Sequence, residues 1–357
     1  MEVKNLKIIS PLGERLIGPD QPVFIVAEVS ANHNQSIVRA KKIIDAAAEA
    51  KVDAVKLQTY TADTLTIDSD NEYFKIKNSN WKGETLYNLY QKAYTPWEWQ
   101  PELKEYAESK GLILFSSPFD STAVDFLEKM DVALYKVAGY EIVDVPLLKK
   151  IAYTKKPVIM SAAMSSIEEI DFAVKILREN GTDQLAVLHC INAYPAKPED
   201  MNILTIPDII RRFKIVSGLS DHSLDPVASV ASVALGGSII EKHITLSRQE
   251  KSADVDFSLE PNEFADLVNM VRKVEKVLGQ VKYGVGINES ANLIFRKSLF
   301  VTKDMKKGEK FSEENLRSIR PGNGLHPKFY EDIIGKTSSQ DIKKGTPLIK
   351  TLIEEKL

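Results

Sequence analysis

Two histidines near the end of a repeating pattern could together hold a divalent metal ion. His222 follows the apolar run KIVSGLS (214–220), and His243 lies near the end of SIIEKHI (238–244). If the two runs are neighbouring strands, both imidazoles can bind one ion and leave open positions, which suits a Lewis acid that polarises a carbonyl group. Each histidine could instead be an unrelated side chain bonded to its neighbours. Their joint position at adjacent strand ends favours the metal site.

Two lysines in earlier runs of the same kind could bind an anion. Lys56 and Lys136 lie in or near the ends of their apolar runs. Hydroxyl groups lie at similar positions in other runs, at Ser116, Ser117, Ser161 and Ser220. Such a polar, positive pocket suits a phosphate or a carboxylate, although either lysine could form a Schiff base, as in aldolases, or an internal salt bridge. Glu28 and Glu141 could act as acid or base, or could pair with these lysines.

Eight short apolar or β-branched runs alternate with amphipathic stretches of helical periodicity, as repeated βα units require. The runs are residues 23–29, 53–58, 112–117, 133–138, 157–162, 185–190, 214–220 and 238–244. Eight such units predict an α/β fold, a closed (β/α)8 TIM barrel. Polar side chains gather at the C-terminal ends of all eight runs, where barrel enzymes place their catalytic groups. An open doubly wound sheet is the alternative, but no GxGxxG follows the first run.

A change in sequence character after residue 280 predicts a second, smaller unit. We expect residues 1–280 to form the catalytic barrel and the polar, glycine-containing residues 281–294 to form a linker. Residues 295–357 are expected to form short strands and turns, in which KDMKKGEKFSEENL and QDIKKGTPLIKTLI resemble each other. A unit of about 60 residues is small for independent stability, so we expect it to pack against another part of the assembly.

The connection after the second run, residues 59–96, is long for a barrel and is expected to cover the active site. The aromatic side chains in and just after it are Trp81, Tyr87, Tyr90, Trp97 and Trp99. They could line a substrate pocket. We expect most of them, together with Leu86 and Leu89, to pack a short helix onto the rim of the barrel instead.

The composition excludes several classes of partner. The formal net charge is -3, so there is no basic surface for nucleic acid and no charge pattern for an anionic membrane. We find no secretory signal and no run of the ~18 apolar residues that a membrane span needs. Cys190 is the one cysteine, which excludes an intrachain disulfide and indicates the cytoplasm. It lies in the apolar run LAVLHC and is expected to be a small core residue rather than a nucleophile.

Motifs along almost the whole chain resemble those of the sialic acid synthase family. They are AEVSANHN, VKLQTYTADTL, FSSPF, YKVAGYE, CINAYPA, GLSDHS and EKHIT, and they occur in the order that the family shows. RPGNG and the two KKG segments resemble the family's C-terminal antifreeze-like (SAF, β-clip) domain. Within the family, QTYTADTLTID, NWKGETLYNLYQKAYTPWEW, EDMN and GLHPKFY are most similar to pseudaminic acid synthases.

The resemblance implies that phosphoenolpyruvate condenses with an open-chain acetamido sugar, which gives a nine-carbon 2-keto acid (a nonulosonate) and phosphate. The implied sugar is 2,4-diacetamido-2,4,6-trideoxy-L-altrose. The resemblance also implies a divalent metal, Mn2+ or Mg2+ with Co2+ as a further candidate, bound by His222 and His243. The implied assembly is a homodimer with exchanged C-terminal domains, in which Arg320 reaches into the barrel of the neighbouring subunit. No nucleic acid or membrane partner is implied.

The resemblance further assigns roles to residues at the strand ends. Glu28 would act as acid or base near the sugar aldehyde, and Lys136 is the second implied catalytic residue. The implied phosphoenolpyruvate ligands are Lys56, Ser117, Lys136, Ser161, Asn192 and Ser220. The implied sugar ligands are Gln58, Glu141, Tyr194, Asp254 and Arg320.

Two departures from the family pattern fall in the phosphate site. Gly139 stands where the family usually has serine, and Ala162 and Ala163 replace threonine and glycine after Ser161. We therefore expect one phosphate contact to be lost. The alternative functions are N-acetylneuraminate or legionaminate synthase, which share this machinery, a lysine Schiff-base aldolase, and a non-enzymatic carbohydrate-binding protein with an SAF module.

Overall fold

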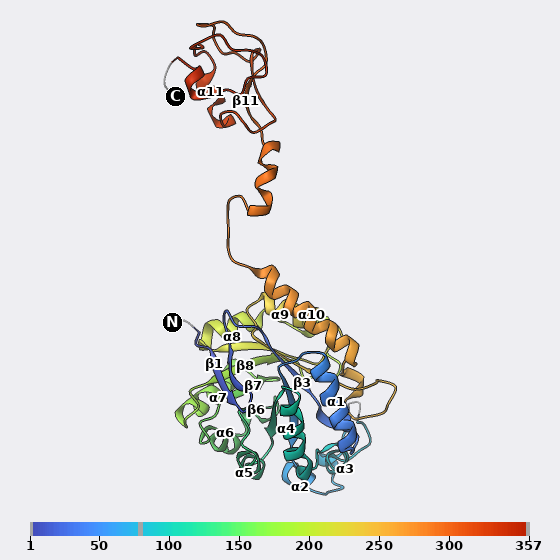
Figure 1. The fold of residues 1–357 in the computed structure, drawn as a ribbon. Helices are drawn as coiled ribbons and strands as arrows, with labels where there is room; N and C mark the ends of the chain where they lie inside the picture. Colours follow the sequence, from blue (N-terminus) through green and yellow to red (C-terminus); the bar gives the residue numbers. More distant parts are fainter. Residues whose placement is uncertain (1–2, 78–80, 355–357) are drawn as a thin grey trace. The chain divides into compact units, whose positions relative to one another are not determined.

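The computed structural model describes residues 3–77 and 81–354. The chain forms two compact units, which divide between Gly279 and Gln280 (Figure 1). The N-terminal unit contains a closed barrel, and the C-terminal unit contains short strands and turns. Each unit has a hydrophobic core of its own.

Within the described residues, eight parallel strands close into a barrel, which confirms the predicted (β/α)8 fold (Figure 1). In their order around the barrel, the strands are β3 (Phe24–Glu28), β4 (Ala54–Thr59), β5 (Ile113–Pro118), β6 (Tyr135–Val137), β7 (Val158–Ala162), β8 (Leu185–Cys190), β9 (Val216–Asp221) and β10 (Ile239–His243). The ring closes because β10 pairs with both β9 and β3. Each strand corresponds to one of the eight predicted runs.

Side chains alternate along each strand between the barrel interior and the surrounding helices, because successive residues of a strand point to opposite faces. In β3, Phe24 belongs to the interior cluster, whereas Ile25 packs in the cluster that includes helix residues. Space inside the barrel is limited: a Cβ atom on Gly218 would lie 2.0 Å from the carbonyl oxygen of Ile239. The same alternation decides which polar residues at the strand ends enter the site.

Helices follow the strands and surround the barrel. They are α1 (Ile37–Glu49), α4 (Gln100–Ser109), α5 (Ser121–Lys129), α6 (Val145–Ala152), α7 (Ile167–Glu179), α8 (Thr205–Phe213), α9 (Val227–Ala234) and α10 (Pro261–Leu278). Local sequence starts several of them: Ser36 caps α1, Asp120 caps α5, and Ser166 forms a capping box with Glu169 in α7.

Shorter elements lie in the loops at the strand ends. The connection between β4 and α4 contains α2 (Ala62–Leu65), η2 (Glu72–Phe74), α3 (Leu86–Ala93) and η3 (Trp97–Trp99). The other 3-10 helices of this unit are η1 (Ser30–His33), η4 (Glu141–Val143), η5 (Pro198–Asp200) and η6 (Val255–Phe257). The predicted helix in the long connection is therefore α3.

An N-terminal hairpin that the sequence analysis did not predict precedes the barrel. It pairs β1 (Leu6–Ser10) with β2 (Gly13–Ile17). Its buried side chains, Leu6, Ile8 and Ile17, join the interior cluster that also contains residues from the strand starts. The hairpin therefore packs against the N-terminal end of the barrel and leaves the opposite end for the site.

The C-terminal unit contains β11 (Ser298–Val301), which pairs antiparallel with β12 (Leu316–Ile319). Its helical segments are η7 (Ile287–Phe295), η8 (Pro327–Phe329), α11 (Tyr330–Ile333) and η9 (Lys350–Leu352). Most of η7 falls in the range 281–294, for which we expected a linker. The proposed boundaries 1–280, 281–294 and 295–357 stay a prediction.

The two similar KKG segments of this unit form reciprocal contacts. Asp341 accepts a hydrogen bond from the backbone N–H of Lys307 at 2.9 Å, and Asp304 accepts one from the backbone N–H of Lys344 at 2.8 Å. Each segment therefore supplies the carboxylate that holds the turn of the other, which explains why the same residue types occur in both.

Candidate active site

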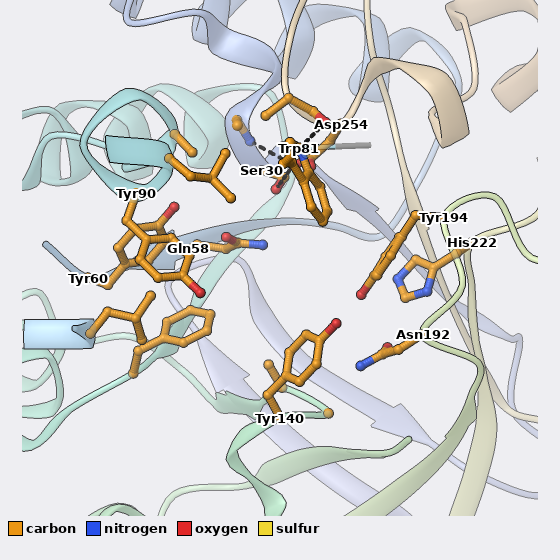
Figure 2. Close-up of a pocket in the computed structure, with 18 of the residues that line it drawn as sticks. Ser30, Gln58, Tyr60, Trp81, Tyr90, Tyr140, Asn192, Tyr194, His222 and Asp254 are labelled. Carbon is orange, nitrogen blue, oxygen red and sulfur yellow. Dashed lines mark hydrogen bonds between the residues drawn. The ribbon is translucent and has the colours of Figure 1, made fainter. Parts of the chain in front are cut away.

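A cavity of about 550 Å³ lies at the C-terminal ends of the barrel strands. Figure 2 shows Gln58, Tyr60 and Tyr90 along one side of it and Tyr194 and His222 along another. Its lining includes these predicted site residues: Lys56, Gln58, Lys136, Glu141, Ser161, Asn192, Tyr194, Ser220, His222, His243 and Asp254. The fold therefore brings most of the predicted residues together, as expected for strand ends of a barrel.

Four charged side chains form a buried cluster at the inner end of the site, and we call them the charged floor: Glu28, Lys56, Lys136 and Glu241. Lys56, Lys136 and Glu241 line the cavity, whereas Glu28, which the sequence analysis expected to be catalytic, does not. Each of the four is at most 5% exposed. The Nζ atom of Lys56 lies 3.0 Å from Glu28 Oε2 and 3.1 Å from Glu241 Oε1. The Nζ atom of Lys136 lies 3.4 Å from the same Glu241 oxygen. Buried charges persist only when they are paired in this way.

The environment sets the protonation of the charged floor. Burial raises the pKa of Glu28 to about 7, although Lys56 acts in the opposite direction. Burial also acts to raise the pKa of Glu241, but Lys136 and Lys56 together lower it to about 2. Burial acts to lower the pKa of Lys56, but the two carboxylates raise it to about 12. Near neutrality the floor therefore holds a fixed Lys56–Glu241 ion pair beside a Glu28 carboxyl that can gain or lose a proton.

His222 and His243 lie side by side at the ends of β9 and β10, with their ring centroids 5.4 Å apart. His222 Nδ1 lies 2.9 Å from the carbonyl oxygen of Ile191, which can only accept, so the proton is on Nδ1 and the lone pair of Nε2 is available. Burial lowers the pKa of His222 to about 4 and that of His243 well below its usual value. Both imidazoles are therefore neutral at pH 7, the form that binds a metal.

Two polar atoms near the histidine pair could accept a further bond. Among the described residues, His243 Nδ1 and Glu241 Oε2 are buried and have no hydrogen-bond partner. The described residues contain no group of three or more His, Cys, Asp and Glu side chains arranged to hold a metal. The two neutral imidazoles fit a divalent ion whose other ligands come from water or substrate, an open arrangement that is typical of catalytic rather than structural sites.

The predicted phosphate ligands divide into two groups. Ser161 lines the cavity, and its Oγ accepts a hydrogen bond from Lys136 Nζ at 2.7 Å. Ser220 lines it too and donates to the charged floor at 3.2 Å. Ser117 does not line the cavity: it accepts from Lys56 Nζ at 3.3 Å. Ser117 therefore orients the lysine rather than meeting a ligand in this conformation.

Asp254 lines the cavity and is held by the chain that follows β3. Its Oδ2 atom accepts hydrogen bonds from Ser30 Oγ and, at 3.3 Å, from the backbone N–H of Ala31. Burial raises its pKa. Ser30 has a positive φ of 45°, a conformation that costs energy in a residue with a side chain and is here held by this bond. Figure 2 shows Ser30 and Asp254 together beside Trp81.

Tyr194 and Glu141 lie in the loops after β8 and β6. The ring of Tyr194 lies 4.5 Å from that of His222 and 4.8 Å from that of Phe257, so it is packed against the histidine pair. Burial raises the pKa of Glu141 to about 7. Arg320, by contrast, belongs to the C-terminal unit and is exposed, and its contact with a partner's barrel stays a prediction.

Sequence reasoning missed several residues that line the cavity, among them Glu241, Tyr60 and Tyr140. Glu241 could have been found from the alternation of β10, since it lies two residues before His243 and must face the same side. The same rule excludes Lys242, whose Nζ pairs with Asp221 Oδ2 at 2.8 Å on the outer face, where both side chains are fully buried.

The two departures from the family pattern lie against each other. A Cβ atom on Gly139 would lie 2.7 Å from the Ala163 Cβ and 3.1 Å from Asn192 Nδ2. Gly139 does not need a positive φ, so its small size, rather than its flexibility, is what the site requires. The methyl group of Ala163 therefore occupies the space that a larger residue at position 139 would need.

The aromatic residues in and just after the connection between β4 and α4 lie in different surroundings. Trp81 and Tyr90 line the cavity. Trp97 donates to the carbonyl oxygen of Tyr60 at 3.0 Å, and Trp99 packs against the core beside α1 and α4.

Cys190 is buried as expected and also lines the cavity, where burial raises the pKa of its thiol to about 11. A thiol with that pKa is a poor nucleophile at neutral pH.

Comparison with known proteins adds to this geometry. The chain matches the model of the NeuB family over residues 43–283 and that of the SAF domain over residues 296–354. A pseudaminic acid synthase of Campylobacter jejuni is 44% identical over 92% of this chain and 96% of that protein. An N,N'-diacetyllegionaminic acid synthase of the same strain is 35% identical over 90% of this chain and 97% of that protein.

A solved structure shows the same architecture. The crystal structure of the N-acetylneuraminic acid (sialic acid) synthetase of Leptospira borgpetersenii, in complex with citrate, has a TM-score of 0.71 and 30% identity. The match covers 81% of this chain and 96% of the Leptospira chain. None of the helices in residues 3–77 and 81–354 is long and apolar enough to span a bilayer.

Proposed function

Because this chain belongs to the NeuB family and ends in an SAF domain, we propose that it condenses phosphoenolpyruvate with an open-chain acetamido sugar. In this reaction C3 of phosphoenolpyruvate bonds to the aldehyde carbon of the sugar, and the aldehyde oxygen takes up a proton. Water adds to C2 and loses a proton, and the bond between C2 and the ester oxygen breaks. The products are phosphate and a nine-carbon 2-keto acid.

The observation that carries this proposal is the pairing of a lysine-rich anion site with two neutral histidines in one cavity. Lys56 and Lys136 share the carboxylate of Glu241, so the cavity keeps positive charge for an anionic substrate once Glu28 holds a proton. Ser161 supports Lys136, and Asn192 lines the cavity close to Gly139. These groups would bind the phosphate and carboxylate of phosphoenolpyruvate.

The histidine pair would hold the metal, Mn2+ or Mg2+ with Co2+ as a further candidate. His222 has its orientation set by the Ile191 carbonyl, the usual second contact of a metal-binding histidine. When bound, such an ion polarises the aldehyde carbonyl. The types of residue available do not distinguish among these metals, because imidazole and oxygen ligands suit several.

Glu28 is the proposed acid and base. Its pKa of about 7 lets it carry a proton at neutral pH and return to the carboxylate form within one turnover. Gln58 Nε2 donates to Glu28 Oε1 at 3.0 Å, so one oxygen is held and the other faces Lys56. Glu28 does not itself line the cavity, but both of its partners do, which supports a role for Glu28 in proton transfer to the aldehyde oxygen through these neighbours.

The proposed sugar is 2,4-diacetamido-2,4,6-trideoxy-L-altrose, which would make the product pseudaminic acid. The higher identity to the pseudaminic acid synthase than to the legionaminic acid synthase supports this choice. Synthesis of N-acetylneuraminate or legionaminate is the alternative, because both reactions use the same chemistry at the strand ends.

Phosphate release tests the proposal directly. The purified chain is incubated with phosphoenolpyruvate, Mn2+ and one acceptor at a time: the altrose derivative, or the acceptors of legionaminate and N-acetylneuraminate synthesis. We expect the highest kcat/KM with the altrose derivative. A preference for another acceptor would replace the sugar, and no release with any acceptor would reject the condensation. Borohydride with substrate should leave no adduct on Lys136, and an adduct would favour the aldolase.

A homodimer with exchanged C-terminal domains is part of the proposal. Arg320 is exposed, and η7 and the residues before it carry apolar side chains exposed in the single chain, such as Val281, Tyr283 and Ile287. These features support an intermolecular contact. The test mixes two inactive variants, Lys136→Met and Arg320→Ala. Activity returns on mixing if Arg320 acts in the partner's barrel, and does not return if it acts within its own chain.

A cytoplasmic location also belongs to the proposal. It is supported by the single cysteine, Cys190, which is free and buried. Export of the protein into the medium of cells that produce it would contradict this location.

A further inference from the structure

Helix α3 lines the cavity with an apolar stripe that the described residues bury only in part. Leu86, Leu89, Tyr90 and Ala93 have the spacing of one helical face, and all four line the cavity. No residue of α3 is fully buried. An amphipathic helix normally hides this stripe against the core, so a stripe left half-buried over a cavity indicates an apolar part of a ligand.

Neighbouring side chains extend this surface. Leu65 from α2 and Tyr60 also line the cavity, and Tyr60 contacts Tyr90 with ring centroids 5.7 Å apart. We call these six residues the apolar wall: Tyr60, Leu65, Leu86, Leu89, Tyr90 and Ala93. Figure 2 shows Tyr60 and Tyr90 together, across the cavity from Tyr194 and His222.

The strand β4 connects the apolar wall to the charged floor. Lys56, Gln58 and Tyr60 alternate with outward-facing residues, so all three meet the cavity. At roughly 3.3 Å per residue, Tyr60 lies roughly 13 Å along the chain from Lys56. This length accommodates the three-carbon and six-carbon substrates end to end. A sugar with its aldehyde at the histidine pair would therefore direct its far end toward the apolar wall.

We propose that the apolar wall is a subsite for the methyl groups of the acceptor sugar, and above all for a deoxygenated terminal carbon. This inference rests on the proposed function, which supplies the direction of the sugar in the cavity. A hydroxymethyl terminus would lose its hydrogen bonds to water against leucine side chains, which costs free energy unless a partner replaces them. A methyl terminus gains from the same contact.

A phosphorylated terminus is the competing occupant, because two lysines lie near the wall. Lys75 and Lys77 line the cavity, but both pair with Glu72, at 2.8 Å and 3.4 Å. Both ion pairs are exposed to solvent, so they hold the lysines only weakly. Neither lysine belongs to the apolar wall, so a phosphate placed against the wall would lie among apolar side chains, and the test below includes it as a competing acceptor.

The test compares the 6-deoxy acceptor with its 6-hydroxy and 6-phosphate counterparts in the full chain. It uses Leu89→Asn, the conservative Leu89→Met, and Gln91→Asn as the matched control, since Gln91 lies on the exposed face of α3 and receives the same new residue. We measure kcat/KM by phosphate release and acceptor affinity by calorimetry. The wild-type chain should prefer the 6-deoxy acceptor by about tenfold or more, the scale at which a pocket discriminates one small group.

Leu89→Asn should remove most of this preference without changing the KM for phosphoenolpyruvate, whereas Leu89→Met and Gln91→Asn should keep it. An equal loss for all acceptors in Leu89→Asn, or a wild-type preference for the 6-phosphate, would overturn the subsite. If calorimetry shows the preference but no phosphate is released, the subsite stands and the condensation fails. If release occurs without any acceptor preference, or no acceptor binds, the subsite is rejected.

Discussion

The two ends of the cavity are built from different kinds of structure. The charged floor comes from barrel strands and is almost completely buried, whereas the apolar wall comes mainly from α3, a short helix without a buried residue. The charged floor is held by buried ion pairs, and removing either partner of such a pair would leave an unpaired buried charge. The wall is held by a loop connection that can change without disturbing the barrel. We therefore expect the reaction to depend on the strands, and the choice of sugar to depend on the connection between β4 and α4.

Removing a floor lysine should produce the largest effect. We expect Lys136→Met to lower kcat/KM by roughly a thousandfold or more, because charged groups in a dry site stabilise developing charge strongly. Lys242→Met is the matched control, since Lys242 is also buried and paired, but on the outer face of the barrel. It should lower the free energy of unfolding by about 3–5 kcal/mol and leave the folded enzyme active. A similar kcat/KM for Lys136→Met and Lys242→Met would contradict a catalytic role for the charged floor.

The histidine pair should give the next largest effect. His222→Asn and His243→Asn should each weaken Mn2+ binding, measured by calorimetry, by more than the roughly 10–100-fold that loss of a ligand's hydrogen-bond partner costs. His189→Asn provides the control, because His189 Nε2 lies 2.7 Å from the carbonyl oxygen of Met201, outside the cavity. Its metal affinity should match that of the wild type. Unchanged affinity in both pair variants would place the metal elsewhere.

The contact between Gly139 and Ala163 tests the part of the site beside Asn192. Gly139→Ser should cost about 1–3 kcal/mol of unfolding free energy by overpacking and should raise the KM for phosphoenolpyruvate. Adding Ala163→Gly should recover most of the lost unfolding free energy and should bring the KM for phosphoenolpyruvate back toward the wild-type value. A double-mutant cycle of urea unfolding measures the first, and phosphate release measures the second. If the double variant is no better than Gly139→Ser alone, the two departures are independent.

The last prediction concerns the pH dependence of stability and Glu141, which lies in the loop after β6. The folded-state pKa of Glu141 is raised from 4.5 to about 7, so the folded chain keeps a proton that the unfolded chain releases. Its contribution to stability is complete below pH 4.5 and is lost as the pH rises to about 7. Glu141→Gln should therefore reduce the slope of unfolding free energy against pH over this range by the equivalent of up to one proton. Gln91→Asn, at an exposed position that does not titrate, should leave the slope unchanged.

Much of the fold followed from local patterns. Eight apolar runs predicted the strands that close the barrel, since parallel strands with both faces buried are apolar throughout. The N-terminal hairpin was missed because its short alternation, with Leu6 and Ile8 inward, resembles many loop sequences. In the long connection, the expected packing of Leu86 and Leu89 on the rim was incomplete, because both lie on the cavity face.

The sequence by itself determined which polar residue types stand at the ends of the strands, including the two lysines and the two histidines. Alternation along β10 links Glu241 to His243, but only the tertiary structure decided which of the two alternating sets faces the cavity, and it placed Glu241 and His243 there and Lys242 outside. Strands that are buried on both faces have no polar–apolar alternation to show which side is inward. The pairing of β10 with β9 and β3 supplies that information, and with it the ion pairs of the charged floor.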